Sequence, residues 1–250
     1  MVEAADSGSK PLLSPDGIRT DGRKIDEMRK VKMEVGLLKN CSGSAYIEQG
    51  KTKIIVAVHG PREAHPKHLA QPGRAILRTR YHMAPFSTSD RKSPAPSRRE
   101  IEITKVIREA LEPAVMLDEF PKTSIDVFIE VLQADAGTRS AGITAAALAL
   151  AEAGIPMRDM VAAVAVGKLE GRVVMDLNEE EDEHGQADMP VAMMPNVNRI
   201  TLLQLNGRLT RAELEEGLSM ARRGVDQLYE MQKQALREKY TSSEPAQEED

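Results

Sequence analysis

The sequence predicts an α+β fold in which helices pack on mixed β-sheets. The first observation is the order of the predicted elements: strands, a helix, a strand and a second helix, followed by more strands and a long helix. The second is a pair of capping boxes, at Ser97–Glu100 and Thr210–Glu213, which are typical of helix N-termini. The third is that 41% of the 250 residues are hydrophobic, enough to bury the core of one large domain or two small ones.

The first half of the chain begins with strands and ends with a helix. Residues 30–48 and 53–59 alternate or run apolar, and residues 75–83 form a further predicted strand. Residues 85–96 are rich in Ser and Pro and predict a long loop, because prolines interrupt regular structure. The first capping box then begins a helix over about residues 98–112, with apolar residues at helical spacing.

In the second half of the chain, two predicted helices enclose a group of strands. A strand at 125–132 leads through residues 135–140 into an Ala-rich helix at 141–153, whose small side chains favour close packing. The second capping box begins a long helix that runs to about residue 239 with one apolar face. The strands predicted between these helices are 160–168, 172–177, 189–194 and 199–205.

The chain ends and the composition limit the class of protein. Residues 1–17 and 240–250 carry little apolar surface, which predicts a flexible N-terminal tail and an acidic C-terminal tail around a folded domain at 18–239. A single cysteine, Cys41, excludes a disulfide framework and a multi-cysteine metal site. No stretch is apolar enough for a membrane span or an export signal, so we expect a cytoplasmic protein. With no Trp, three Phe and four Tyr, a broad aromatic platform for stacking bases is excluded.

Positive charge is concentrated in one segment of an otherwise acidic chain. The formal net charge is −5, yet residues 60–100 contain nine Lys and Arg against three acidic residues, so the remainder carries −11. This asymmetry predicts a path for a polyphosphate chain such as RNA. The alternative is an ordinary solvated surface.

Arg98 and Arg99 occupy the first positions of a predicted helix, where the helix dipole disfavours cations. Two guanidinium groups beside free backbone N–H groups form a strong anion site, and a bound phosphate would remove the electrostatic penalty. The pair therefore predicts a contact with phosphate. The alternative is that both arginines pair with acids on a neighbouring surface.

Residues 135–140 repeat this pattern at the next helix. Gly137 permits close backbone approach, Thr138 and Ser140 offer hydroxyl groups, and Arg139 offers a bidentate guanidinium group. The segment matches neither a Walker A loop nor a dinucleotide-binding fingerprint. It predicts a site for one small oxyanion, and we call residues 135–140 the phosphate loop. The alternative is a capped helix with a surface arginine.

An acidic connection, residues 176–190, joins two apolar strands. Seven acidic residues fall within positions 176–188, and such a run is ordinarily a solvated loop, which is the expectation for residues 179–181 and 183. Asp182 and Asp188 lie nearer the flanking strands, where two fixed carboxylates can hold a divalent cation or transfer a proton. His184 between them is either a further ligand or a bystander.

Five motifs, taken together and in order, resemble those of the RNase PH family over residues 18–239, and the resemblance is strongest to the catalytic RNase PH-like subunits of the archaeal exosome. It implies the RNase PH-like fold, which is similar to domain 2 of ribosomal protein S5. The motifs are Arg19–Arg23, Gly60–Glu63, Ser97–Glu100, Asp135–Arg139, and the pair Asp182 and Asp188.

This resemblance implies a phosphorolytic 3′ to 5′ exoribonuclease. Inorganic phosphate, the co-substrate, attacks the last phosphodiester of RNA and releases a nucleoside diphosphate, and the reverse reaction extends RNA. Arg98 and Arg99 would grip the RNA 3′ end, Asp182 would be the catalytic acid or metal-assisting carboxylate, and Asp188 would help to position Mg²⁺ or Mn²⁺. The attacking phosphate would be held by Gly137, Thr138, Arg139 and Ser140.

The resemblance also implies partners. The family pattern is a hetero-hexameric ring, in which the chain alternates with a related inactive RNase PH-like subunit, beneath RNA-binding cap subunits, with single-stranded RNA threading the pore. Arg62, Lys67 and His68 would contact RNA at the neck of the pore. Two departures, Ala136 in place of a second Gly and Asn178 in place of an Asp, lie beside the predicted site.

Three alternatives remain open from the sequence. A non-catalytic RNA-binding subunit of the same ring would lack the arginine pair, the phosphate loop or the aspartates, and this chain lacks none of them. A homohexameric, tRNA-trimming RNase PH would use the same chemistry. An unrelated metal nuclease that uses water would not need the phosphate loop.

Overall fold

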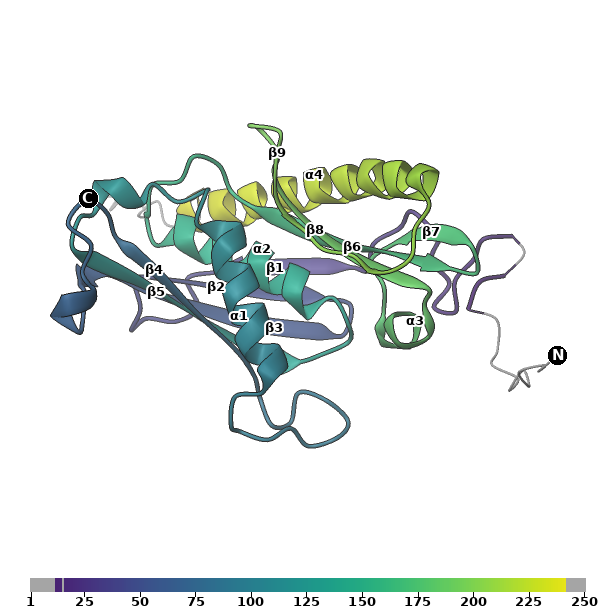
Figure 1. The fold of residues 1–250 in the computed structure, drawn as a ribbon, viewed down its shortest axis with the longest axis horizontal. Coiled ribbons are helices and arrows are strands. Elements are labelled where there is room, and N and C mark those ends of the chain that lie inside the picture. Colours follow the sequence, from purple (N-terminus) through teal and green to yellow (C-terminus); the bar gives the residue numbers. More distant parts are fainter. Residues whose placement is uncertain (1–11, 15, 242–250) are drawn as a thin grey trace, which may run out of the picture.

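Two β-sheets and four α-helices form the structure, a computed structural model that describes residues 12–14 and 16–241 (Figure 1). Among the strands of this described part of the chain, only β4 and β5 pair in parallel, and every other strand pair is antiparallel. The first sheet contains, in order, β1 (Val31–Val35), β2 (Gly43–Gln49), β3 (Thr52–Glu63), β5 (Thr123–Gln133) and β4 (Ile76–Met83). The second contains β10 (Asn206–Gly207), β8 (Ala187–Met194), β6 (Ala162–Leu169) and β7 (Arg172–Met175), with β9 (Arg199–Leu203) paired to β8. The predicted α+β class with mixed sheets is confirmed.

Helix α2 (Thr138–Glu152) lies between the two sheets and contacts β2 and β3 on one side and β6 and β8 on the other. Its Ala-rich sequence suits this position, because small side chains let both sheets approach the helix backbone. A Cβ atom placed on Gly43 in β2 would lie 2.5 Å from the carbonyl oxygen of Ala149, so that position requires glycine. The central position of α2 fixes its N-terminus relative to both sheets.

The other helices cover the sheets from outside. Helix α1 (Arg98–Leu111) packs on β4, and the long α4 (Arg211–Thr241) crosses the second sheet and reaches β1 of the first (Figure 1). The described residues also contain two short 3₁₀ turns, at Lys67–Leu69 and Leu117–Glu119. No helix within residues 12–14 and 16–241 is both long and apolar enough to cross a membrane.

Three local predictions need correction. Residues 30–48 form two strands rather than one, because Gly36 adopts a left-handed conformation with φ of 74° and the chain turns before β2. Helix α2 begins at Thr138 instead of 141, because Gly137 with φ of 62° already ends the preceding loop. Helix α3 (Glu179–His184) occupies part of the predicted acidic loop, where Asn178 and Glu181 form a capping box.

The predicted tails lie partly outside the described residues. Leu13 falls in the predicted N-terminal tail, yet it is buried and bridges to Arg19, so the packed part of the chain begins earlier than residue 18. Helix α4 extends to Thr241, two residues past its predicted end. Residues 1–11, 15 and 242–250 lie outside the described part of the chain.

Candidate active site

The N-terminus of α2 presents unpaired donors. Gly137 is the N-cap residue in a left-handed conformation and provides no side-chain cap, so the first N–H groups of the helix lack intrahelical partners. Ala136 also has positive φ, 55°, which is the conformation that the expected glycine adopts freely. The loop thus has the backbone conformation expected for a glycine at this position, and Ala136 adopts it at a cost in conformational energy.

Two polar atoms beside this helix end are buried and have no hydrogen-bond partner among the described residues: the Oγ of Ser140 and the Nε of Arg139. Buried donors are normally satisfied, and each exception needs an explanation. Arg139 also donates through Nη1 to Oε1 of Gln204, which follows β9. One guanidinium edge is therefore held by the protein while another donor remains available to an anion.

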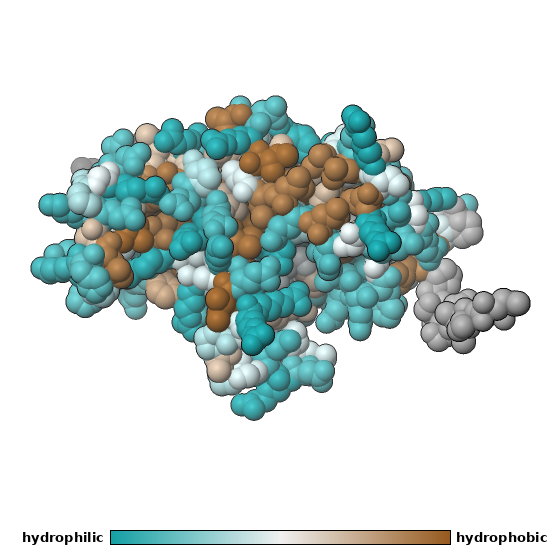
Figure 2. Space-filling model, in the orientation of Figure 1, coloured by the Kyte–Doolittle hydropathy of each residue, from teal (hydrophilic) through white to brown (hydrophobic). Residues whose placement is uncertain are grey.

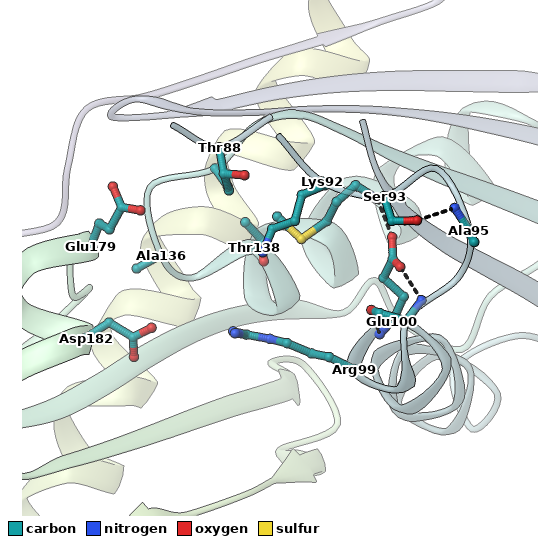
Figure 3. Close-up of a pocket in the computed structure, with 13 residues that line it drawn as sticks. Thr88, Lys92, Ser93, Ala95, Arg99, Glu100, Ala136, Thr138, Glu179 and Asp182 are labelled. Carbon is teal, nitrogen blue, oxygen red and sulfur yellow. Dashed lines mark hydrogen bonds between the residues drawn. The ribbon is translucent and has the colours of Figure 1, made fainter. Parts of the chain in front are cut away.

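Helix α1 brings Arg99 to the same place. Its capping box is formed as predicted, with Glu100 accepting from the backbone N–H of Ser97 at 2.7 Å and from that of Met83 in β4 at 2.9 Å. The side chain of Arg99 makes no hydrogen bond or ion pair with any described residue. Its guanidinium group points across the cavity toward Asp182 (Figure 3).

Asp182 and Asp188 approach from the second sheet, Asp182 on α3 and Asp188 at the start of β8. Burial, followed by the negative charge of Asp182, raises the pKa of Asp188 to about 6, although the positive charges of Arg139 and Arg99 oppose the shift. The two carboxylates are therefore coupled through their like charges, and burial is the largest cause of the shift at Asp188.

These groups surround two adjoining cavities. The smaller has a volume of about 50 Å³ and is lined by Arg99, the phosphate-loop residues 137–140, Asp182 and Asp188. The larger measures about 400 Å³ and lies beneath the 85–97 loop, from which Lys92 extends toward Thr138 (Figure 3). Four residues line both cavities: Arg99, Ala136, Thr138 and Asp182. A small anion and a larger substrate can thus meet at these residues.

A buried ion cluster supports the site from behind. Arg29 donates to both carboxylate oxygens of Asp176, at 3.0 and 2.7 Å, and also contacts Asp135 at the start of the phosphate loop. Arg19 makes a bidentate contact with Glu181, the residue before Asp182. Burial alone would raise the pKa of Asp176, but the hydrogen bonds and charge of Arg29 and the charge of Arg23 lower it.

The prediction that Glu181 lies in a solvated loop is wrong, because its side chain is fully buried. The spacing of Asn178 and Glu181 fits a capping box and was the signal that could have indicated α3. Three further residues beside the site had no assigned role in the sequence: Arg29, Gln204 and Tyr81. No local pattern marks them, since each contacts the site from a distant part of the chain.

The donor set fits a divalent cation only in part. Within the described residues, no group of three or more His, Cys, Asp and Glu is placed to hold a metal ion. Asp182 and Asp188 would supply two carboxylates, and water and substrate phosphates would complete the shell, as is common for Mg²⁺. His184 is exposed, its Nδ1 lies 3.0 Å from the Glu180 carbonyl oxygen, and it is not grouped with the two aspartates as a third ligand among the described residues.

Other predicted RNA contacts lie away from these cavities. Arg98 is exposed and lines neither of them. Arg62 lies 3.5 Å from Asp126, Lys67 pairs with Glu63, and His68 belongs to an exposed 3₁₀ turn. The positive excess of residues 60–100 is also reduced by pairs of Arg74, Arg78 and Arg80 with acids of α1 and β5.

Family models place the chain among known proteins. Residues 27–156 match the model described as 3′ exoribonuclease family, domain 1, and residues 159–224 match domain 2 of the same family. The chain belongs to the RNase PH family of 3′ exoribonucleases. The predicted family and exoribonuclease activity are confirmed, and the two matched regions correspond to the first and second sheets with their helices.

Curated RNase PH relatives cover nearly the full chain. The exosome complex component Rrp41 of Pyrococcus abyssi is 65% identical over 229 residues, which is 92% of each chain. The protein of the same name from Nitrosopumilus maritimus is 59% identical over 229 residues, covering 92% of this chain and 94% of its own. The predicted resemblance to archaeal exosome subunits therefore agrees with these relatives.

Solved structures share the RNase PH-like fold. Rice Rrp46 aligns with a TM-score of 0.80 at 22% identity, covering 88% of this chain and 100% of the rice chain. A chain of an Archaeoglobus fulgidus exosome with RNA bound to the active site aligns with a TM-score of 0.75 at 24% identity, covering 90% and 93%. The predicted RNase PH-like fold is confirmed.

Proposed function

We propose that this chain is the phosphorolytic subunit of an archaeal-type exosome ring, cleaving RNA from its 3′ end with inorganic phosphate as the attacking group. The observation that carries the proposal is the small cavity in which Arg99, Arg139, Asp182 and Asp188 converge beside a cavity large enough for a nucleotide. A nuclease that uses water would have no need for a second, cation-lined anion site.

The attacking phosphate would occupy the cavity of about 50 Å³. The free N–H groups at the start of α2, the guanidinium of Arg139 and the hydroxyls of Thr138 and Ser140 would hold it. The unpaired Oγ of Ser140 and Nε of Arg139 support this assignment, because a bound anion gives both atoms a partner.

The terminal phosphodiester of RNA would lie at the boundary of the two cavities, against Arg99. Bringing two anions together requires fixed positive charge, and Arg99 is free of any described acidic partner. Lys92 adds a second cation from the loop above. Arg98, on the exposed side of the same helix end, would contact a phosphate farther along the RNA.

The reaction forms a bond from a phosphate oxygen to the terminal phosphorus and breaks the bond from that phosphorus to the 3′ oxygen. The leaving 3′ oxygen takes a proton, and the product is a nucleoside diphosphate. Asp182 faces the boundary of the cavities and would donate or direct that proton. The neighbouring Asp188 is half-buried, and because its pKa is raised to about 6 it would hold a proton only near or below that pH. A Mg²⁺ or Mn²⁺ ion held by Asp182 and Asp188, when bound, would stabilise negative charge on the phosphate oxygens.

The ring partner would be a related RNase PH-like subunit. Exposed apolar side chains gather on and beside β9, where Figure 2 shows an apolar area. Such a patch is typical of a protein interface. Its members are Val197, Ile200, Leu203 and Leu205. RNA-binding cap subunits, the neck contacts of Arg62, Lys67 and His68, and a cytoplasmic location remain parts of this proposal.

The test is to incubate the chain, alone and with its co-purifying partner, with single-stranded RNA and Mg²⁺ or Mn²⁺, with and without phosphate. Nucleoside diphosphates formed only with phosphate are the expected product. Monophosphates formed without phosphate would overturn phosphorolysis. Activity only with the partner supports the mixed ring, whereas full activity of the chain alone as a hexamer would support a homohexameric RNase PH.

A further inference from the structure

Tyr81 touches the phosphate loop from behind. It lies in β4 with 3% of its surface exposed, and its hydroxyl is 2.8 Å from Oγ1 of Thr138, the first residue of α2. The tyrosine ring does not line either of the two cavities, whereas Thr138 lines both. Tyr81 therefore meets the site only through Thr138.

Each of the two hydroxyls carries one proton, so the direction of the hydrogen bond between them determines which proton remains available to a ligand. The Tyr81 hydroxyl has no other hydrogen-bond partner among the described residues, so its proton goes to Oγ1 of Thr138. Burial raises the pKa of Tyr81, which keeps that proton in place across the working pH range. Thr138 accepts from the tyrosine and donates to no described residue, which leaves its own proton for a group in the cavity.

We propose that Tyr81 is a positioning residue that aims the Thr138 hydroxyl at the attacking phosphate. This inference rests on the proposed function and deepens it, because it names a residue outside the cavity that sets the affinity for phosphate. A hydroxyl that accepts a hydrogen bond on one lone pair keeps its own proton away from that direction before the ligand arrives, so less rotational freedom is lost on binding.

Ser140 provides an internal contrast. Its Oγ is buried beside the same cavity but has no partner, so its proton is free to rotate. Of the two hydroxyls that flank Arg139, only that of Thr138 is oriented in advance. We therefore expect the Tyr81 contact to affect Thr138 and to leave the contribution of Ser140 unchanged.

Strand β4 gives this contact a rigid base. Two residues after Tyr81, the N–H of Met83 donates at 2.9 Å to Glu100, the N3 residue of the α1 capping box. The backbone N–H of Tyr81 itself donates to Oγ1 of Thr104 in the same helix at 3.0 Å. Strand β4 thus contacts both α1 and α2 near their N-termini, which carry Arg99 and Thr138 respectively.

The main test replaces Tyr81 by Phe and measures the KM for inorganic phosphate and the KM for RNA separately, in the assembled ring. Tyr81→Phe removes only the hydroxyl, and we expect the phosphate KM to rise about threefold to tenfold while the RNA KM changes by less than about twofold. A purely structural role would lower stability or alter both constants together. An unchanged phosphate KM overturns the proposal.

Tyr229→Phe is the matched control. Tyr229 of α4 is also buried and lines neither cavity, and its hydroxyl donates to Asp159 at 2.8 Å and accepts from Asn196. This variant loses a buried tyrosine hydroxyl with at least as many hydrogen bonds, so it reports the cost in stability alone. We expect its phosphate KM to match that of the wild type, and an equal rise in both variants would overturn the proposal.

A double-mutant cycle with Thr138→Val covers the case in which Tyr81→Phe folds poorly. Thr138→Val should raise the phosphate KM at least as much as Tyr81→Phe, and Thr138→Ser should restore much of it. In the Thr138→Val background Tyr81→Phe should have no further effect, so additive effects count against the proposal. If the wild type itself releases no nucleoside diphosphate with phosphate, the proposed function fails; if it does and the cycle shows no coupling, only the Tyr81 inference fails.

Discussion

Two groups of arginines and carboxylates lie on opposite sides of the phosphate loop, and they differ in whether their charges are paired. Behind the loop, Arg29, Asp176 and Glu181 are buried and their charges are paired, although Nη2 of Arg23, 3.7 Å from Glu181, makes no hydrogen bond there. In front of it, among the described residues, Arg99 has no acidic partner, Nε of Arg139 is buried without a hydrogen bond, and Asp188 has a pKa of about 6.

The difference separates a scaffold from a binding site made of the same residue types. A closed network leaves no charge for a ligand, and its value lies in holding the loop and α3 in place. Open charges are costly in the empty protein and become favourable only when a ligand of opposite sign arrives. The paired cluster should therefore govern stability, and the open cluster should govern activity.

The largest expected effect is on the open side, with Asp182→Ala. We expect turnover to fall by about 10²–10⁴-fold, because the leaving 3′ oxygen loses the group that supplies or directs its proton. RNA should remain bound, and urea unfolding should change by less than about 1 kcal/mol. Release of nucleoside diphosphate, RNA binding and urea unfolding measure these quantities. Turnover near that of the wild type would remove Asp182 from the mechanism.

On the buried side, Asp176→Ala should lower the free energy of unfolding by about 3–5 kcal/mol, because it leaves the Arg29 guanidinium buried without its carboxylate. Urea denaturation followed by circular dichroism measures the change. Asp226→Ala is the matched control, since Asp226 pairs with Arg222 on the solvent-facing side of α4 and its loss should cost less than about 1 kcal/mol. Equal losses in both variants would contradict the comparison.

The two clusters should respond to pH with opposite sign. The pKa of Asp176 is lowered, so its stabilising charge is present above its ordinary value of 3.8 and is lost as the pH falls further. The pKa of Asp188 is raised to about 6, so its ionisation costs stability as the pH rises through that value. In EDTA, Asp188→Asn should exceed the wild type in stability by about 2 kcal/mol at pH 8. A difference that does not shrink toward pH 5 would contradict this assignment.

The smallest effects distinguish two adjacent arginines. Arg99 lines both cavities and Arg98 lines neither, so Arg99→Glu should weaken RNA binding more than Arg98→Glu. Each variant should lower the slope of log affinity against log salt by about 1, as expected for the loss of one phosphate contact. Titration of labelled RNA at several salt concentrations gives both quantities. An unchanged slope in either variant would show that its arginine does not contact phosphate.

Much of the fold and of the site could be predicted because the signals are local. The capping box at Ser97 and Glu100 involves residues three positions apart, and the phosphate loop involves consecutive residues. The conformation of Ala136 could not be predicted in the same way. Its positive φ depends on the surrounding loop, in which Thr52 of β3 donates to the Ala136 carbonyl at 3.1 Å.

The sequence by itself determined the α+β class, most element types, the family, and the set of residues that converge on the small cavity. Only the tertiary structure decided which charges are free. Arg19 and Glu181 are 162 positions apart, and Tyr81 and Thr138 are 57 apart, so the folded topology alone brings each pair into contact. Helix caps and hydrophobic periodicity depend on residues a few positions apart, so they can be read from the sequence. Burial and ion pairing depend on the order of the strands in the sheets, which decides whether the charges of each cluster are paired.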